Sequence, residues 1–260
     1  MLIDDSEMDT VSVIIPCFNA QGTLLRAIHS VQNQSHALVE LIVIDGGSSD
    51  GSLLVLESLT VKPSYWISEK DKGVYDAINK GIEVAKGKWI YIIGADDALS
   101  HCEVIAEMLS NAKKNTEIIF GYVENESSGN SFVPLLHKSE FSKMLYWKNT
   151  LHQQSVLYRA TLFQDFRFNV NYRVLSDYDF HLHLLSNSAI GASVSTIVAR
   201  CGSTGLSKNF NTALYLEELK IKMSRLNPLL FALNIPWVIL KFTTKKLGNL
   251  GARLNPSIKK

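Results

Sequence analysis

The first half of the chain alternates between two kinds of hydrophobic pattern. Nearly continuous apolar runs, typical of strands buried on both faces, occupy residues 11–15, 39–44, 65–67, 89–93 and 117–122. Between these runs apolar side chains recur at helical spacing, which predicts helices over residues 24–31, 53–59, 74–85 and 103–109. Strand, turn and helix repeated four times predict βαβ units in a mostly parallel, Rossmann-like α/β sheet flanked by helices.

The second half of the chain is less regular. We expect strands over residues 153–158 and 192–199, helices over residues 176–185 and 211–226, and loops at residues 127–131 and 202–207. A length of 260 residues suits one large domain with an appendage. We therefore predict one domain over residues 1–210 and a helical tail over residues 211–260.

The predicted tail is both basic and apolar. Nine basic residues and no acidic residue follow Glu218, so with a net charge of +1 the preceding part of the chain carries −8. Residues 226–242 are strongly apolar but broken by Pro228 and Pro236, and Trp237 and several lysines accompany them. Either this stretch binds an anionic membrane surface, or it is a helix packed on the domain with a solvated basic end.

Composition favours a folded protein in a reducing compartment. The chain is 46% hydrophobic and 20% charged, as is ordinary for soluble domains. Its three cysteines, Cys17, Cys102 and Cys201, match no metal motif and cannot form a closed set of disulfides. The acidic first ten residues argue against a signal peptide, and no run of 18 apolar residues indicates a transmembrane helix. We expect a cytoplasmic protein, peripheral on the inner membrane face if the tail binds lipid, with no nucleic-acid partner.

Polar residues follow the buried strands, at the sheet edge where parallel sheets bind their ligands. Asp96 and Asp97 are adjacent carboxylates after the run at residues 89–93, and they repel each other unless a cation compensates their charge. A hard divalent ion with oxygen ligands does so and leaves positions open for phosphate oxygens. The alternative is a polar turn or a helix N-cap, in which aspartate is common.

Asp45 opens a second such loop, at residues 45–51, whose glycines let a ligand approach the backbone closely. Asp45 is a candidate hydrogen-bond acceptor for a nucleobase or a ribose. The alternative is a tight turn in which Asp50 caps the following helix. The loop is not a phosphate-binding Walker loop, because the Lys-Ser/Thr ending is absent.

Four blocks, taken in order, resemble one enzyme family. They read IIPCFNA at residues 14–20, VIDGGSSDG at 43–51, EKDKGVYDAINKG at 69–81 and AKGKWIYIIGADD at 85–97. This series resembles family 2 of the inverting glycosyltransferases, which have the GT-A fold, over roughly residues 11–210. HQQS at residues 152–155 and SDYDFHL at residues 176–182 resemble further segments of that family.

The resemblance implies a site for a nucleoside-diphosphate sugar, such as a UDP- or GDP-sugar. The donor-binding residues that it implies are Pro16, Phe18, Asn19, Asp45, Asp76, Asn79 and Asp96. Asp97 would ligand Mn²⁺ or Mg²⁺. Ile78 stands where many relatives have an arginine, so Lys72 or Lys80 would have to supply that cation. Gly94 stands where many relatives have a further aspartate.

The resemblance also implies a catalytic base. Asp177 aligns with the carboxylate that takes the proton from the acceptor hydroxyl as this oxygen attacks the anomeric carbon. Asp179 is the second candidate. The alternative is that Asp177 caps its helix and Asp179 pairs with Arg173 or Arg167.

Four further polar residues are candidates near the base. His152 and Gln153 would contact the acceptor sugar. His181 and His183 lie two positions apart and therefore point to different sides of a helix, which favours one packed and one exposed histidine over a metal site.

These observations predict an enzyme that moves a sugar from a nucleoside diphosphate to an acceptor hydroxyl with inversion. The tail suggests a lipid-linked saccharide acceptor, as in the assembly of bacterial surface polysaccharides. One alternative is a nucleotidyltransferase that makes a nucleotide sugar, although the Gly-rich, Arg/Lys-containing loop of such enzymes is absent after the first strand. Another is a non-catalytic, membrane-associated scaffold with a decayed domain, in line with the changes at Ile78, at Gly94 and at Ser176, which stands where many relatives have a glutamate.

Overall fold

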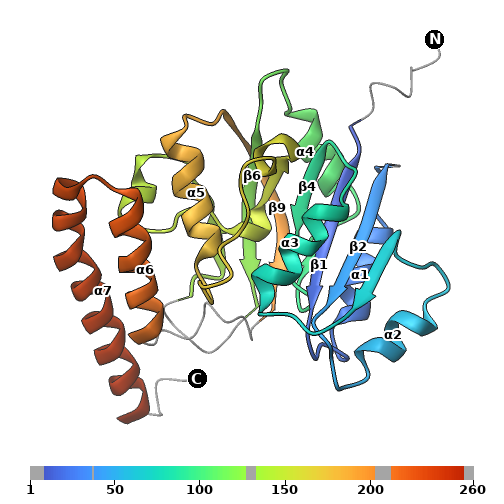
Figure 1. Ribbon diagram of the computed structural model, residues 1–260, viewed down its shortest axis with the longest axis horizontal. Coiled ribbons are helices and arrows are strands. Elements are labelled where there is room, and N and C mark those ends of the chain that lie inside the picture. Colours follow the sequence, from blue (N-terminus) through green and yellow to red (C-terminus); the bar gives the residue numbers. More distant parts are fainter. Residues whose placement is uncertain (1–8, 37, 127–132, 203–211, 255–260) are drawn as a thin grey trace.

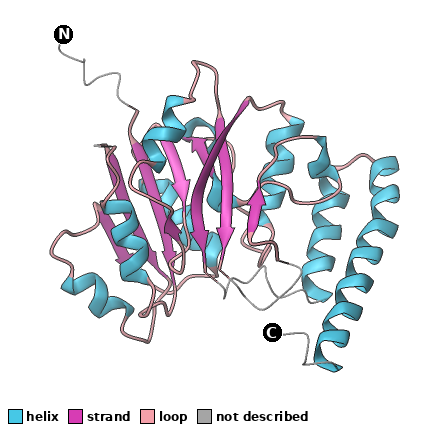
Figure 2. Cartoon of the chain, turned by 180° about the vertical axis from the view of Figure 1, so that it is seen from behind, coloured by secondary structure: helices cyan, strands magenta, loops and turns pink. Residues whose placement is uncertain are grey.

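The apolar runs of the sequence form a single mixed sheet with helices on both faces. This computed structural model describes residues 9–36, 38–126, 133–202 and 212–254, with the side chains of the last segment described up to residue 246. Figure 1 shows the sheet at the centre, with α6 and α7 side by side at one edge of the molecule, and Figure 2 shows the sheet from behind.

The strands and helices follow the predicted order. The strands are β1 (Val11–Cys17), β2 (Val39–Asp45), β3 (Tyr65–Ser68), β4 (Trp89–Ile92), β5 (Ala98–Leu99), β6 (Ile118–Asn125), β7 (Leu136–Lys138), β8 (Val156–Arg159) and β9 (Gly191–Cys201). The α-helices are α1 (Leu24–Gln32), α2 (Ser52–Ser58), α3 (Val74–Val84), α4 (Val104–Ser110), α5 (Ser176–Ser186), α6 (Thr212–Arg225) and α7 (Pro228–Leu254). Three 3₁₀ turns are η1 (Lys143–Tyr146), η2 (Gln153–Ser155) and η3 (Ala160–Phe163).

The sheet is parallel in its first half and mixed in its second. Its strand order is β3-β2-β1-β4-β8-β6-β9-β5, with β7 paired to β6. Strands β3, β2, β1 and β4 are parallel, whereas β8 is antiparallel to both β4 and β6. Strand β9 is again parallel to β6. The predicted α/β architecture is confirmed, and the parallel βαβ pattern holds for the first four strands.

Both faces of the sheet are apolar because alternate residues of each strand point to opposite sides. Val13 and Ile15 pack in the cluster that includes α1, α2 and α4, while Ile14 packs in the cluster that includes α3 and α5. Gly81 brings α3 against β1, since a Cβ at this position would lie 2.5 Å from Ile14 Cγ2. The first strand and its flanking helices therefore form one packed body.

The C-terminal segment forms two helices instead of a broken stretch. Pro228 is the first residue of α7, where a missing N–H costs nothing, and the helix continues through Pro236. Helix α6 contacts both α5 and α7. The division at residue 210 stays a prediction, but α6 packs as part of the body that carries α5.

Local details differ from the predictions in two places. Residues 153–155 form the turn η2 ahead of the short strand β8, so the strand predicted from residue 153 begins later. The short strands β5 and β7 carried no periodic signal because two or three residues are too few to show one. The predicted loops at residues 127–131 and 202–207 lie, except for Gly202, outside the described residues.

Candidate active site

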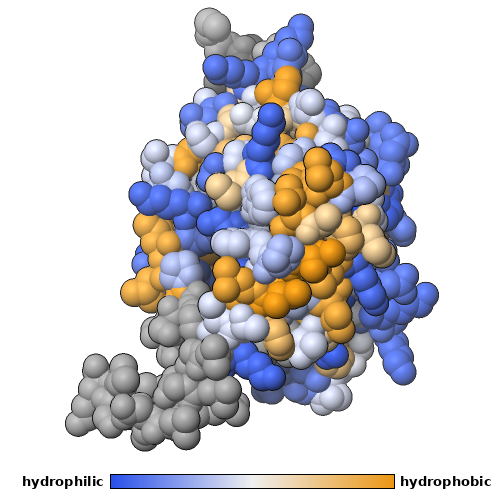
Figure 3. Space-filling model, turned by 90° about the vertical axis from the view of Figure 1, so that its left-hand side faces the viewer, coloured by the Kyte–Doolittle hydropathy of each residue, from blue (hydrophilic) through white to orange (hydrophobic). Residues whose placement is uncertain are grey.

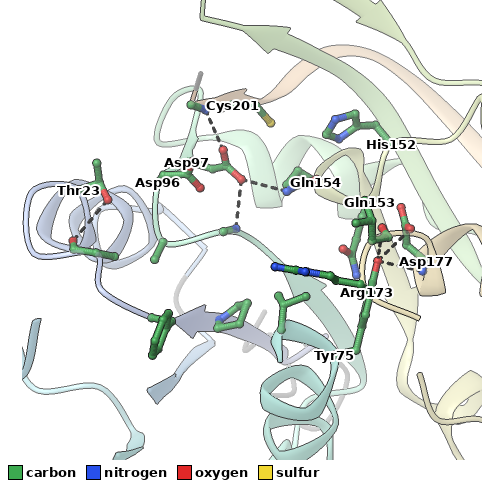
Figure 4. A pocket seen from close by; sticks show the side chains of 18 of the residues that line it. Thr23, Tyr75, Asp96, Asp97, His152, Gln153, Gln154, Arg173, Asp177 and Cys201 are labelled. Atoms are coloured by element: carbon green, nitrogen blue, oxygen red, sulfur yellow. Dashed lines mark hydrogen bonds between the residues drawn. The ribbon is translucent and has the colours of Figure 1, made fainter. Parts of the chain in front are cut away.

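The loops after β1 and β4 meet the start of α5 around a cavity of about 580 Å³ (Figure 4). Of the predicted site residues, those that line the cavity are Pro16, Phe18, Asn19, Asp96, Asp97, His152, Gln153 and Asp177. Asp45, Asp76 and Asn79 do not line it. The structure thus brings together most of the candidates for donor, metal, acceptor and base in one cavity.

Asp97 is buried, and its carboxylate accepts three hydrogen bonds. Gly202 N donates to Oδ1 at 2.9 Å, while Gly94 N and Gln154 Nε2 donate to Oδ2 at 3.2 and 3.0 Å. Burial and the neighbouring charge of Asp96 nevertheless raise the pKa of Asp97 to about 6. A bound cation would offset both effects, so the acidic pair fits a divalent ion.

Two glycines let the backbone close around the acidic pair. A Cβ at Gly94 would lie 2.6 Å from Asp97 Oδ2, and one at Gly202 would lie 2.6 Å from the carbonyl oxygen of Asp96. A third aspartate at position 94 would therefore displace Asp97. No group of three or more His, Cys, Asp and Glu side chains in the described part of the chain could hold a metal ion. Asp97 and Asp96 leave coordination positions of a divalent ion open for phosphate oxygens.

Phe18 and Asn19 line the cavity just after β1. The Phe18 side chain is 63% exposed, which leaves its ring face available to a flat ligand. Asn19 has a positive φ of 48°, its backbone N–H donates to Ser48 Oγ at 2.7 Å, and its Oδ1 accepts from Ser49 N at 2.9 Å. The loop after β1 is therefore tied to the loop after β2.

Asp45 is fully buried at the end of β2. Its carboxylate accepts hydrogen bonds from Ser48 Oγ at 2.5 Å, Ser68 Oγ at 2.7 Å and Gly47 N at 3.1 Å. Burial by itself would raise the pKa of Asp45, but the hydrogen bonds from Ser48 and Ser68 hold it below its ordinary value. In this structure Asp45 stabilises the turn after β2, and its predicted contact with the donor stays a prediction.

Asp76 and Asn79, on α3, make contacts that hold neighbouring loops. Asp76 Oδ2 accepts from Lys72 N at 3.1 Å and lies 3.8 Å from Lys80 Nζ. Asn79 Nδ2 donates to Phe168 O at 2.8 Å, and Phe168 N donates back to Asn79 Oδ1 at 2.9 Å. Asn79 thus fixes the segment that leads to α5.

Asp177 lies in the first turn of α5 and lines the cavity (Figure 4). Tyr75 OH donates to Asp177 Oδ1 at 3.1 Å and also to Val174 O at 2.6 Å, so its single proton is shared. Asn149 Nδ2 lies 3.5 Å from Asp177 Oδ2. Burial raises the pKa of Asp177 to about 6 although these donors favour its ionised form. A carboxylate that titrates near neutral pH is suited to accept a proton.

Asp179 has a different environment from Asp177. It is buried and forms a bidentate ion pair with Arg225 of α6, with Nε–Oδ1 and Nη2–Oδ2 distances of 2.6 and 2.8 Å. Arg225, and neither Arg173 nor Arg167, is therefore its partner. Asp179 does not line the cavity.

Helix α6 also holds the segment ahead of α5. The carboxylate of Glu217 accepts hydrogen bonds from the backbone N–H groups of Arg173, Val174 and Leu175, at 2.8, 2.9 and 2.5 Å. The sequence analysis singled out neither Glu217 nor Arg225 as a site residue. The position of Glu217 among the last acidic residues of the chain is a weak sign of a special role. No local pattern indicates its hydrogen-bond partners, which lie 42 to 44 positions away.

The acceptor candidates lie near Asp177. His152 and Gln153 line the cavity together with His137 and Asn149. Gln153 Nε2 is buried and has no hydrogen-bond partner among the described residues, which leaves a donor for a ligand.

The two histidines of α5 behave as expected from their spacing. His181 is fully buried, lies 2.8 Å from Tyr158 OH through Nε2, and has a pKa lowered to about 3 by burial. His183 is partly exposed and lies 3.3 Å from Arg225 Nη1.

The mixed sheet flanked by helices, with an acidic pair after β4 and a cavity-facing carboxylate at the start of α5, is a GT-A type of fold. A family model described as Glycosyl transferase family 2 matches residues 12–190. A PGL/p-HBAD biosynthesis glycosyltransferase of Mycobacterium bovis is 30% identical over 189 residues, which cover 69% of this chain and 71% of the relative. The chain therefore belongs to glycosyl transferase family 2.

Solved structures share the fold at low sequence identity. TarS of S. aureus in complex with UDP-GlcNAc superimposes with a TM-score of 0.67 at 16% identity, covering 92% of this chain and 73% of that one. The match to another TarS crystal structure covers 82% of this chain and 64% of the TarS chain. The mannosyltransferase PcManGT of Pyrobaculum calidifontis, in complex with GDP-Man and Mn²⁺, gives a TM-score of 0.66 at 16% identity, covering 97% and 82%. Among the described residues, no helix has the length and apolar character needed to span a membrane.

Proposed function

We propose that the protein transfers a sugar from a nucleoside-diphosphate sugar to an acceptor hydroxyl, with inversion at the anomeric carbon. The observation that carries this proposal is that Asp97, after β4, and Asp177, on α5, line the same cavity. A ligand in this cavity can therefore contact an acidic metal-binding pair and a separate proton acceptor at once.

Asp177 acts as the base in this proposal. It takes the proton of the acceptor hydroxyl while the acceptor oxygen bonds to the anomeric carbon. The bond between that carbon and the phosphate oxygen breaks, and its electron pair leaves with the nucleoside diphosphate. With a pKa of about 6, Asp177 is ionised at neutral pH and is still basic enough to bind a proton.

Asp97, with Asp96 beside it, would hold Mn²⁺ or Mg²⁺. The bound ion would offset the charge on the donor's diphosphate. Asp97 Oδ1 accepts one N–H, from Gly202, and so keeps a lone pair for a metal ion. The solved PcManGT complex, with GDP-Man and Mn²⁺, supports the same combination of ligands.

A UDP- or GDP-sugar is the proposed donor, because the solved relatives bind UDP-GlcNAc and GDP-Man. Pro16, Phe18, Asn19 and Asp96 would contact it from the cavity wall. Asp45, Asp76 and Asn79 would act on the donor site mainly through the loops that they hold. His152 and Gln153, beside Asp177, would bind the acceptor sugar.

Thermal unfolding with UDP or GDP, with and without Mn²⁺, tests the donor site. We expect metal-dependent stabilisation by one nucleotide, in wild type and in Asp177→Asn alike, because Asp177 is not a metal ligand in this proposal. Asp97→Asn should lose the metal dependence. Analysis of the reaction products distinguishes glycosyl transfer from nucleotidyl transfer. Glycosyl transfer releases a nucleoside diphosphate, and nucleotidyl transfer releases pyrophosphate. Absence of metal-dependent stabilisation by either nucleotide would contradict the proposal.

We also propose that the acceptor is a lipid-linked saccharide and that α7 holds the enzyme on the cytoplasmic face of an anionic membrane. Large apolar side chains on α7 are exposed, and they are Leu229, Leu233, Ile235, Trp237, Ile239 and Leu240. Figure 3 shows hydrophobic residues gathered on the side of the molecule that carries α7. The inner side of α7 is packed, with Asn234 and Val238 buried. Lys220 and Lys246 are exposed and add attraction to anionic lipid, whereas Lys222 and Arg225 are engaged in ion pairs with Glu218 and Asp179.

Vesicle co-sedimentation tests the membrane proposal. We expect binding to vesicles that contain phosphatidylglycerol and weak binding to phosphatidylcholine alone. Glutamate at Leu229, Leu233 and Leu240 should abolish it, whereas glutamate at the equally exposed Leu54 and Val61 should not. Equal loss in both variants would refute a specific role for α7, and dimerisation without lipid would point to a second copy of the chain as the occupant of this face.

A further inference from the structure

The sequence leaves the donor's diphosphate without an obvious cationic side chain. Ile78 is buried in the core cluster that contains α3, so its position supplies no charge to the cavity. Lys80 Nζ pairs with Glu69 at 2.7 Å, and neither Lys80 nor Lys72 lines the cavity. Neither predicted substitute therefore lies where the diphosphate is proposed to bind.

Among the described residues, Arg173 is the arginine or lysine that lines the cavity. Figure 4 shows its side chain extending from the side of Tyr75 and Asp177 toward the side of Asp96 and Asp97. Its guanidinium forms no hydrogen bond or ion pair with the other described residues, although three carboxylates line the same cavity. All five N–H donors of this group are thus available to a ligand.

The backbone of Arg173 is held in place while its side chain is left available. Glu217 accepts the N–H groups of Arg173 and of the next two residues, at distances of 2.5 to 2.9 Å. This anchor fixes the origin of the side chain relative to α5, which carries Asp177. The planar guanidinium is itself pre-organised to pair with two phosphate oxygens.

We propose that Arg173 binds the diphosphate of the donor and supplies the cation that Ile78 cannot. This inference rests on the proposed function, because it assumes that a nucleoside diphosphate occupies the cavity. Arg173 exchanges no proton in the reaction. It offsets the negative charge that collects on the phosphate oxygen when the bond to the anomeric carbon breaks.

Calorimetric titration with UDP and GDP in the presence of Mn²⁺ tests the proposal, using whichever nucleotide the wild type binds. Arg173→Met should weaken diphosphate binding by about ten- to a hundredfold, the usual value of a hydrogen bond between charged groups. Arg173→Lys should recover part of it, because lysine restores the charge without the paired donors. Binding of the matching nucleoside, uridine or guanosine, should be unchanged in both variants.

Two further variants serve as controls for the loss of a positive charge. Arg200→Met removes an exposed arginine that pairs with Glu124 away from the cavity, and it should bind like wild type. Lys72→Met should do the same, and a loss at Lys72 with none at Arg173 would overturn the proposal. If the wild type binds neither diphosphate, the proposed function fails as well. If the wild type binds and Arg173→Met binds equally well, the role of Arg173 alone is refuted.

Discussion

Replacing Asp177 with asparagine tests the electrostatics of the site without any substrate. Burial raises the pKa of Asp177 from 3.8 to about 6, so the folded protein binds this proton more tightly than the unfolded chain does. A difference of about two pKa units corresponds to at most about 3 kcal/mol of unfolding free energy at neutral pH. Because the side chain is partly exposed, solvent screening reduces this figure.

The sign of the effect follows from the direction of the shift. The stabilising contribution of Asp177 is complete below its unfolded pKa of 3.8 and is lost as the pH rises through about 6. Asparagine does not titrate, so the variant lacks this loss. The stability of Asp177→Asn relative to wild type should therefore grow by about 1.4 kcal/mol between about pH 5 and pH 7.5.

Urea unfolding at a series of pH values, with EDTA present, measures this growth. Any change in hydrogen bonding to Tyr75 or Asn149 adds an offset that does not depend on pH, so the slope alone carries the prediction. In Tyr75→Phe the pKa of Asp177 should rise further, because the hydrogen bond from the phenol favours the ionised form and is lost. A stability difference that stays flat over this range would show that Asp177 titrates normally and would refute the assignment of a raised pKa.

Three other substitutions probe the surroundings of the two carboxylates. Glu217→Ala leaves three backbone N–H groups ahead of α5 without their acceptor, so urea unfolding should show a loss of about 2 kcal/mol. Arg225→Met leaves the buried carboxylate of Asp179 without its ion-pair partner. The free energy of unfolding at neutral pH should fall by about 3 kcal/mol in the same assay. Gly94→Ala forces Asp97 to move, and the Mn²⁺-dependent thermal stabilisation by UDP or GDP should fall while the melting temperature without ligand changes less.

The first half of the fold could be predicted because its signals are local. Short apolar runs mark strands β1, β2 and β4, and helical periodicity marks α1 and α3. A few consecutive residues are therefore enough to predict each of these elements. The second half depends on distant partners. Strand β8 inserts antiparallel between β4 and β6, and it pairs Tyr91 with Leu157, a residue far along the chain. No pattern inside β8 specifies that direction.

The candidate site follows the same division. Asp96, Asp97 and Asp177 stand in short motifs and could be named from the sequence, although their assigned roles stay predictions. Glu217 and Arg225 could not, because each acts on residues more than 40 positions away. The sequence suggests Arg173 only as a partner for Asp179, whereas in the structure Arg225 is that partner and Arg173 lines the cavity.

The spacing of Asp177 and Asp179 explains why one helix can carry two carboxylates with different surroundings. Residues two positions apart on a helix point to different sides. Asp179 therefore faces α6 and meets Arg225, while Asp177 faces the cavity and meets Tyr75. The ion pair at Asp179 ties α5 to α6, and together with the buried side chains of α5 it holds the helix with Asp177 facing the cavity. A truncation that begins near residue 210 removes Glu217 and Arg225 together with α7, so loss of activity in such a protein would not by itself identify α7 as a membrane anchor.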